Sequence, residues 1–200
     1  MRASEQSRPD VKMRREQWHS SLLDVPVNHL VFLDESSAST SLAKLYGRCG
    51  VGERLSGSSP YGHWITVSML CAVRLDGPIS PLLVDGPVDG AMFTAWIEQS
   101  LLRELRPGDV VIMDNLNTHR VAGVSKLLND AGHPFFYLPP YSPDFNPIEN
   151  MWSKVKSILR KLAARTFGEL LEAMKAAILS VTEDDCKGYF RHCGYSSNTI

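Results

Sequence analysis

The stretch LPPYSPDFNPIENMW, residues 138–152, places four prolines within ten residues and then enters a segment with the pattern of a helix. Proline fixes φ and removes a backbone donor, so this approach has few conformations and loses little entropy on folding. Pro147 suits the first helical position, which puts Glu149 in the first turn. Such a fixed carboxylate is suited to metal binding, and a proline-rich surface loop is the alternative interpretation.

Strand and helix patterns alternate on both sides of this stretch. Apolar runs predict strands over 29–35, 109–115 and 134–138, and Asp76-Gly77 divides 63–88 into a hairpin of two more. Helical spacing of apolar residues predicts helices over 90–105, 121–132, 147–165 and 166–181. A three-strand meander followed by alternating helices and strands indicates an α/β fold with a mixed sheet, flanked by helices.

The composition is that of an ordinary globular protein. The 200 residues are 44% hydrophobic and 22% charged, enough for one domain with a real core. No apolar run approaches the ~20 residues of a membrane helix, so we expect no membrane partner. Four cysteines without CxxC spacing argue against a zinc site and favour a reducing, cytoplasmic location. The net charge of −1 gives no overall attraction to nucleic acid.

Three acids lie at the ends of predicted elements. Asp34 and Asp114 come at the end of two apolar strands, and Glu149 lies in the first turn of a helix. The ends of neighbouring central strands meet at one edge of a sheet, where gathered carboxylates need a cation to remain charged. Magnesium or manganese prefers oxygen ligands, and two such ions suit phosphodiester chemistry. Each acid also has a structural interpretation, because strand-terminal aspartates often form turns or caps. Asn146 with Glu149 resembles a capping box.

The segments LVFLDE, VVIMDNLNTHR and LPPYSPDFNPIENMWSKVK together resemble the catalytic domain of DDE transposases of the mariner-like group found in bacterial insertion sequences. The 34 residues between Asp114 and Glu149 are similar to the D…D(34)E spacing of that group. The PYSPDFNPIE block is much more specific than an isolated pair of acids. The resemblance runs from about residue 29 to about residue 165 and extends plausibly to the YFRHCGY tail.

This resemblance implies an RNase H-like fold in which Asp34, Asp114 and Glu149 hold two Mg²⁺ or Mn²⁺ ions. It implies cleavage of the element's ends and attack of the freed 3′ hydroxyl on TA-containing target DNA, with Asn115 and His119 orienting ligands or DNA. A homodimer on paired DNA ends is a further implication.

Three regions are expected: a helical lead-in at 1–28, the catalytic domain at 29–165, and a C-terminal helix and tail at 166–200 packed on the same domain. Transposases of this type carry an N-terminal helix-turn-helix region, for which 28 residues leave no room. We therefore expect a catalytic fragment: either the downstream product of a split reading frame, with the helix-turn-helix domain on a separate chain, or a truncated copy left by decay of the element.

Basic residues in the helix after Glu149 are candidates for DNA phosphate contacts: Lys154, Lys156, Arg160 and Lys161. An ordinary solvated helix face is the alternative. The leading functional hypothesis is a metal-dependent DNA nuclease and strand transferase. The alternatives are a catalytically silent, transposase-derived DNA-binding or oligomerisation remnant and an RNase H-like nuclease that does not transpose.

Overall fold

The computed structural model describes residues 4–22, 24–43, 47–54, 56, 64–115 and 122–195. Within these ranges, no helix is long and apolar enough to cross a membrane. The strands are β1 Leu30–Ser39, β2 Thr66–Arg74, β3 Gly77–Asp85, β4 Val110–Met113 and β5 Phe135–Tyr137. The α-helices are α1 Pro9–Trp18, α2 Gly90–Trp96, α3 Leu102–Glu104, α4 Ala122–Asp130, α5 Pro147–Leu162, α6 Phe167–Leu179 and α7 Glu183–His192.

One five-stranded mixed sheet forms the centre, in the order β3-β2-β1-β4-β5. The first three strands are an antiparallel meander, whereas β4 and β5 run parallel to β1. This confirms the predicted α/β mixed sheet. Gly77 has a φ of 152° at the predicted hairpin turn between β2 and β3.

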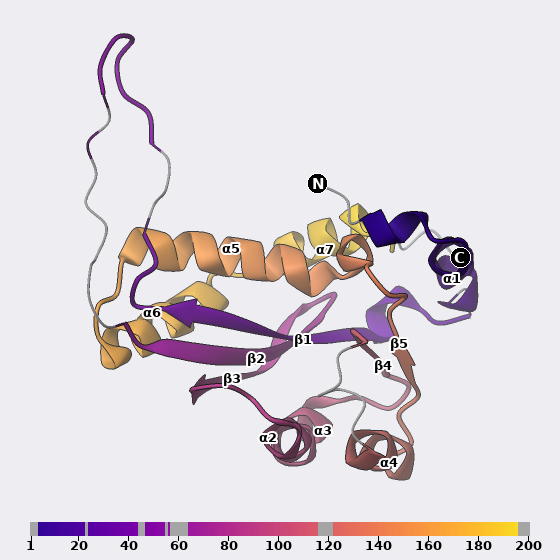
Figure 1. Ribbon diagram of the computed structural model, residues 1–200. Helices are drawn as coiled ribbons and strands as arrows, with labels where there is room; N and C mark the ends of the chain where they lie inside the picture. The colour runs from indigo at the N-terminus through magenta and orange to yellow at the C-terminus, as the bar shows by residue number, and fades with distance from the viewer. Residues whose placement is uncertain are drawn as a thin grey trace.

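Helices cover both faces of the sheet (Figure 1). On one face α5, α6 and α7 pack over residues such as Phe32 and Ile112, and on the other α2 and α4 pack over Val31 and Val111. Successive residues of a strand point to opposite faces, so a central strand covered on both sides is apolar throughout. The burial of the first four residues of β1 fits this, since each is at most 1% exposed.

Three elements differ from the sequence predictions. Strand β1, predicted over 29–35, does not end at Glu35 but continues to Ser39, because its second half pairs with β2. The helix predicted over 90–105 forms with a π-helical turn at Ile97–Leu101. In the lead-in, the α-helical part is α1, followed by short 3₁₀ turns.

The C-terminal region holds a second helix beyond the one predicted there. Helix α7 begins with a capping box between Thr182 and Asp185, and the 166–181 prediction had stopped before it. Its Cys186 and Phe190 are buried in the same core as α5. Helix α7 therefore belongs to the helical layer that covers the α5 face of the sheet.

Candidate active site

The register of two parallel strands brings Asp34 and Asp114 together. Leu33 of β1 is paired with Met113 of β4, so the next residue on each strand is an aspartate at the same level. Phe32 and Ile112 belong to the core beneath α5, and side chains alternate between faces. Both aspartates therefore point to the face that α5 covers. Asp34 is only 6% exposed, and its Oδ1 accepts a 2.8 Å hydrogen bond from the backbone N–H of Glu35.

The first turn of α5 provides Glu149. Pro147 occupies the start of this helix, as predicted, and Ile148 is buried beside it. Asn146 lies at the N-cap position, but its side chain makes no capping hydrogen bond. The capping-box interpretation of Asn146 and Glu149 is therefore wrong, and both side chains are available for another role.

The three carboxylates interact electrostatically. Burial raises the pKa of Asp34 well above its ordinary value, and the charges of Glu149 and Asp114 raise it further. Glu149 is an exposed residue, but partial burial of its carboxyl group raises its pKa as well. The charge of Lys156 lowers the pKa of Glu149, and the charge of Asp114 raises it. Like charges held this close destabilise the ionised state unless a cation joins them.

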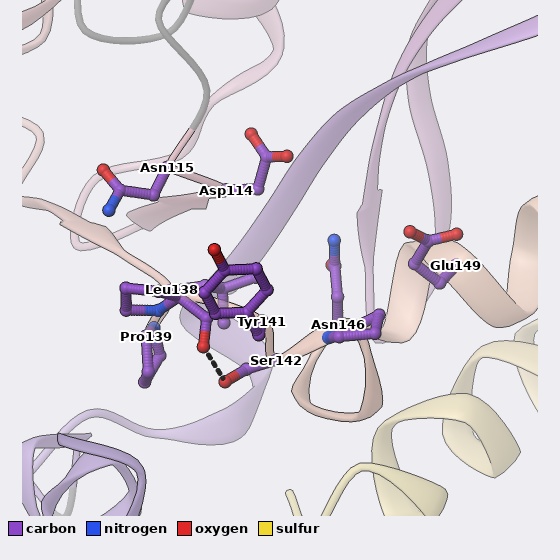
Figure 2. Close-up of a pocket in the computed structure, with 10 residues that line it drawn as sticks. Asp114, Asn115, Leu138, Pro139, Tyr141, Ser142, Asn146 and Glu149 are labelled. Atoms are coloured by element: carbon purple, nitrogen blue, oxygen red, sulfur yellow. Dashed lines mark hydrogen bonds between the residues drawn. The ribbon is translucent and has the colours of Figure 1, made fainter. Parts of the chain in front are cut away.

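A cleft of about 450 Å³ opens between β4 and the proline-rich segment. Asp114, Asn115, Asn146 and Glu149 line it, together with residues 138–143. Figure 2 shows the side chains of Asp114, Asn146 and Glu149 pointing to the same side of the proline-rich segment. The Oδ1 atoms of Asn115 and Asn146 are buried and have no hydrogen-bond partner among the described residues, and the whole Asn146 residue is only 3% exposed. Buried acceptors of this kind are uncommon and indicate a missing donor or ion.

Contacts from the N-terminal segment hold the proline-rich segment in place. Arg15 donates hydrogen bonds to Ser142 Oγ (2.7 Å) and to both carboxylate oxygens of Asp144 (3.0 and 2.6 Å). Its guanidinium carbon also lies 4.3 Å from the centre of the Phe145 ring. Tyr141 adopts a φ of 57°, which is uncommon outside glycine, and Gln6 Nε2 donates to its carbonyl oxygen. These contacts fix the approach to Glu149, and the sequence had not indicated them.

The basic residues of α5 divide between two sides of the helix. Lys156 and Arg160 lie seven and eleven residues after Glu149, nearly two and three whole turns, so they share its side. Lys154 and Lys161 lie on another side. Lys154 forms an ion pair with Asp185 and donates to the Ser180 carbonyl, so it is already engaged within the protein. Of the predicted DNA contacts, Lys156 and Arg160 are the two on the Glu149 side of α5, and the charge of Lys156 acts on the Glu149 carboxylate.

The donor set fits hard divalent cations. Asp34, Asp114 and Glu149 offer carboxylate oxygens, and the unpartnered oxygens of Asn115 and Asn146 stand beside them. Oxygen ligands of this type are those that Mg²⁺ and Mn²⁺ prefer. Among the described residues, no group of three acidic, histidine or cysteine side chains is close enough to hold one ion in this conformation. His119, the other predicted orienting residue, lies outside the described residues.

The sequence profile of the family described as DDE superfamily endonuclease matches residues 29–171. The chain belongs to this family. The match covers the strands that carry Asp34 and Asp114 and the helix that carries Glu149, so this DDE endonuclease domain contains all three acids. No curated protein sequence matches the chain.

Solved structures of Mos1 transposase share the fold of this DDE endonuclease. A pre-cleavage Mos1 transpososome superposes with a TM-score of 0.78 at 15% identity, over 97% of this chain and 60% of that one. A Mos1 mariner paired-end complex with Mn gives a TM-score of 0.76 at 14% identity, over 98% of this chain and 61% of that one. The Mos1 transposase catalytic domain with Raltegravir and Mn gives a TM-score of 0.68 at 12% identity, over 97% of this chain and 90% of that one. The chain thus spans about 60% of the Mos1 chains in the two assemblies, and the likeness establishes the predicted RNase H-like fold.

Proposed function

We propose that this chain is the catalytic domain of a transposase, which cuts DNA at the ends of a mobile element and joins the freed 3′ end to target DNA. The observation that carries the proposal is that three carboxylates, on β1, directly after β4 and on α5, interact electrostatically, and that two of them, Asp114 and Glu149, line one cleft. Family membership supports it independently, since the profile spans all three.

Asp34, Asp114 and Glu149 would hold Mg²⁺ or Mn²⁺, as two ions. Such ions activate an attacking oxygen and stabilise a leaving one in phosphodiester chemistry. The Mos1 structures with Mn and Mg support the choice of metal. Without ions the three acids would repel a phosphodiester, so the site favours DNA only in its metal-loaded form.

The chain's other residues would position the DNA. Lys156 and Arg160 continue the line of Glu149 along α5 and would contact phosphates beside the cut site. Asn115 and Asn146 carry unpartnered oxygens that would orient a ligand or a water molecule. The Mos1 neighbours include complexes on paired transposon ends, which supports DNA as the partner. From the resemblance noted in the sequence we include in the proposal TA-containing target DNA, a homodimer and a helix-turn-helix domain on another chain.

A catalytically silent remnant is the second candidate. The observation that favours it is that the described carboxylates are not yet gathered at ligand spacing. Metal-dependent nicking, lost in Asp114→Asn, separates an enzyme from a remnant.

Strand transfer needs its own experiment. The purified chain would be given a pre-nicked duplex and a supercoiled TA-containing plasmid, with Mg²⁺ or Mn²⁺. A transposase domain joins the 3′ end to the plasmid, whereas an RNase H-like nuclease cuts without joining. Failure to join while nicking persists would contradict the transposase proposal and leave the nuclease.

A further inference from the structure

A second hollow adjoins the catalytic cleft. It has a volume of about 230 Å³ and lies between α1 and the end of β5. It shares Asn115 and residues 138–140 with the catalytic cleft, so the two hollows are continuous. Its remaining lining residues are Arg14, Gln17, Trp18, Ser21 and Tyr137. We refer to it as the α1 groove.

The α1 groove differs in charge from the catalytic cleft. Asp114 and Glu149 line the cleft, whereas none of the described residues that line the α1 groove is acidic. Arg14 and Gln17 are exposed, and their side chains end in hydrogen-bond donors. Arg14 forms no ion pair within the described part of the chain, although the next residue does. A cation and neutral donors beside an acidic cleft suit the phosphates of a strand that enters or leaves the cleft.

Helix α1 is firmly attached beside the α1 groove. Arg15 binds Ser142 and Asp144, and Trp18 Nε1 donates a 2.7 Å hydrogen bond to the buried Tyr195 hydroxyl. Residues three apart share one side of an α-helix, so Arg14 and Gln17 are presented together. The attachment means that the backbone that carries Arg14 and Gln17 is in place before any ligand arrives, which lowers the entropy lost on binding.

We propose that the α1 groove binds the DNA strand on one side of the cut site, with Arg14 and Gln17 contacting its phosphates. This rests on the proposed function and extends it. Lys156 and Arg160 lie on α5, beyond Glu149, whereas the α1 groove meets the cleft at Asn115. The strand therefore crosses the carboxylates between two basic contacts, one on α5 and one on α1. Asn115 lines both hollows and stands where the strand passes from one to the other.

The test measures DNA binding by fluorescence anisotropy, with Ca²⁺ in place of Mg²⁺ or Mn²⁺ so that the carboxylates are metal-loaded while cleavage is not supported. One probe is a labelled duplex trimmed to end at the cut position. The other probes carry the same duplex with a single-stranded extension on the 3′ or the 5′ side. Arg14→Ala is expected to weaken binding of one extended probe roughly three- to tenfold and to lower its salt slope by about 0.7, the value for one phosphate contact on a single strand. Binding of the trimmed probe should not change.

Arg103→Ala is the matched control, because Arg103 is also exposed and lies on α3, on the opposite face of the sheet. It removes the same charge and should bind every probe as the wild type does, whereas Arg14→Lys should restore most of the lost affinity. Equal behaviour of Arg14→Ala and Arg103→Ala, or an equal loss on trimmed and extended probes, would overturn the α1 groove while leaving the proposed function standing. If the wild type binds no probe, the proposed function is itself contradicted, and so is the proposal that the α1 groove binds DNA.

Discussion

Replacing Asp34 by asparagine is expected to stabilise the metal-free protein while removing its metal-dependent chemistry. The Asp34 side chain is 6% exposed, and Glu149 and Asp114 raise its pKa in addition to burial. Asparagine has the same shape and keeps an oxygen to accept the hydrogen bond from the Glu35 N–H. The substitution therefore removes a buried charge and little else.

The expected gain in stability of Asp34→Asn follows from the cost of burying an ionised carboxylate among like charges. We expect the free energy of unfolding in EDTA to rise by about 1–3 kcal/mol. For a chain of this size each kcal/mol corresponds to about 2–4 °C in Tm. Added Mn²⁺ should then make the wild type the more stable of the two proteins. At a hundredfold excess of Mn²⁺ over Kd, the free energy of unfolding rises by about 2.7 kcal/mol for the wild type and by much less for Asp34→Asn.

Urea denaturation at neutral pH, with EDTA or with Mn²⁺, measures both effects. Asp130→Asn is the control, because Asp130 is 60% exposed and pairs with Lys126 on the surface; it should change stability by about 0.5 kcal/mol or less. Loss of stability in Asp34→Asn without metal would refute the reasoning, since it would make Asp34 a structural partner rather than a strained ligand.

Three further substitutions test the framework around the site. Arg15→Ala should lower the free energy of unfolding by about 1.5–3 kcal/mol, because it breaks charged hydrogen bonds to the proline-rich segment; an unchanged urea midpoint would contradict this. The pKa of Asp185 is lowered to about 2, first by its hydrogen bond with Lys154. Its folded-state pKa lies below the unfolded value, so this stabilisation is present above about pH 4 and is lost as the pH falls towards 2. Asp185→Ala should therefore be less stable than the wild type at pH 7, and the two should converge in acid; a constant difference would count against the ion pair. Thr166→Ala should cost about 1 kcal/mol by removing the capping box of α6, as thermal denaturation would show.

Local signals explain which parts of the fold could be predicted. Pro147 at the first helical position marked the start of α5, and the Asp76-Gly77 turn marked the hairpin of β2 and β3. Both signals depend on backbone preferences of single residues. The end of β1 could not be found in this way, because its second half is held by pairing with β2 rather than by its own apolar pattern.

The placement of the two aspartates could be predicted from the sequence, but the side-chain contacts that hold the surrounding segments could not. Asp34 and Asp114 could be expected to meet because they follow apolar runs of central strands, and the register of β1 with β4 now brings them to the same level. Arg15 and Asp144 are 129 residues apart, and nothing in either local sequence indicates that they meet. The same holds for Lys154, whose partner lies on α7. Such pairs depend on tertiary packing, which periodicity does not report.

Single-turnover nicking of a labelled duplex, with Mg²⁺ or Mn²⁺, tests the central claim most directly. The wild type would be compared with Asp34→Asn, Asp114→Asn and Glu149→Gln, each checked for folding by circular dichroism. If the three carboxylates form one metal site, each single variant falls to background, and a double variant loses nothing more, because residues that act as a unit are not additive. Nicking that survives in any one of the three would show that this residue is not part of the metal site.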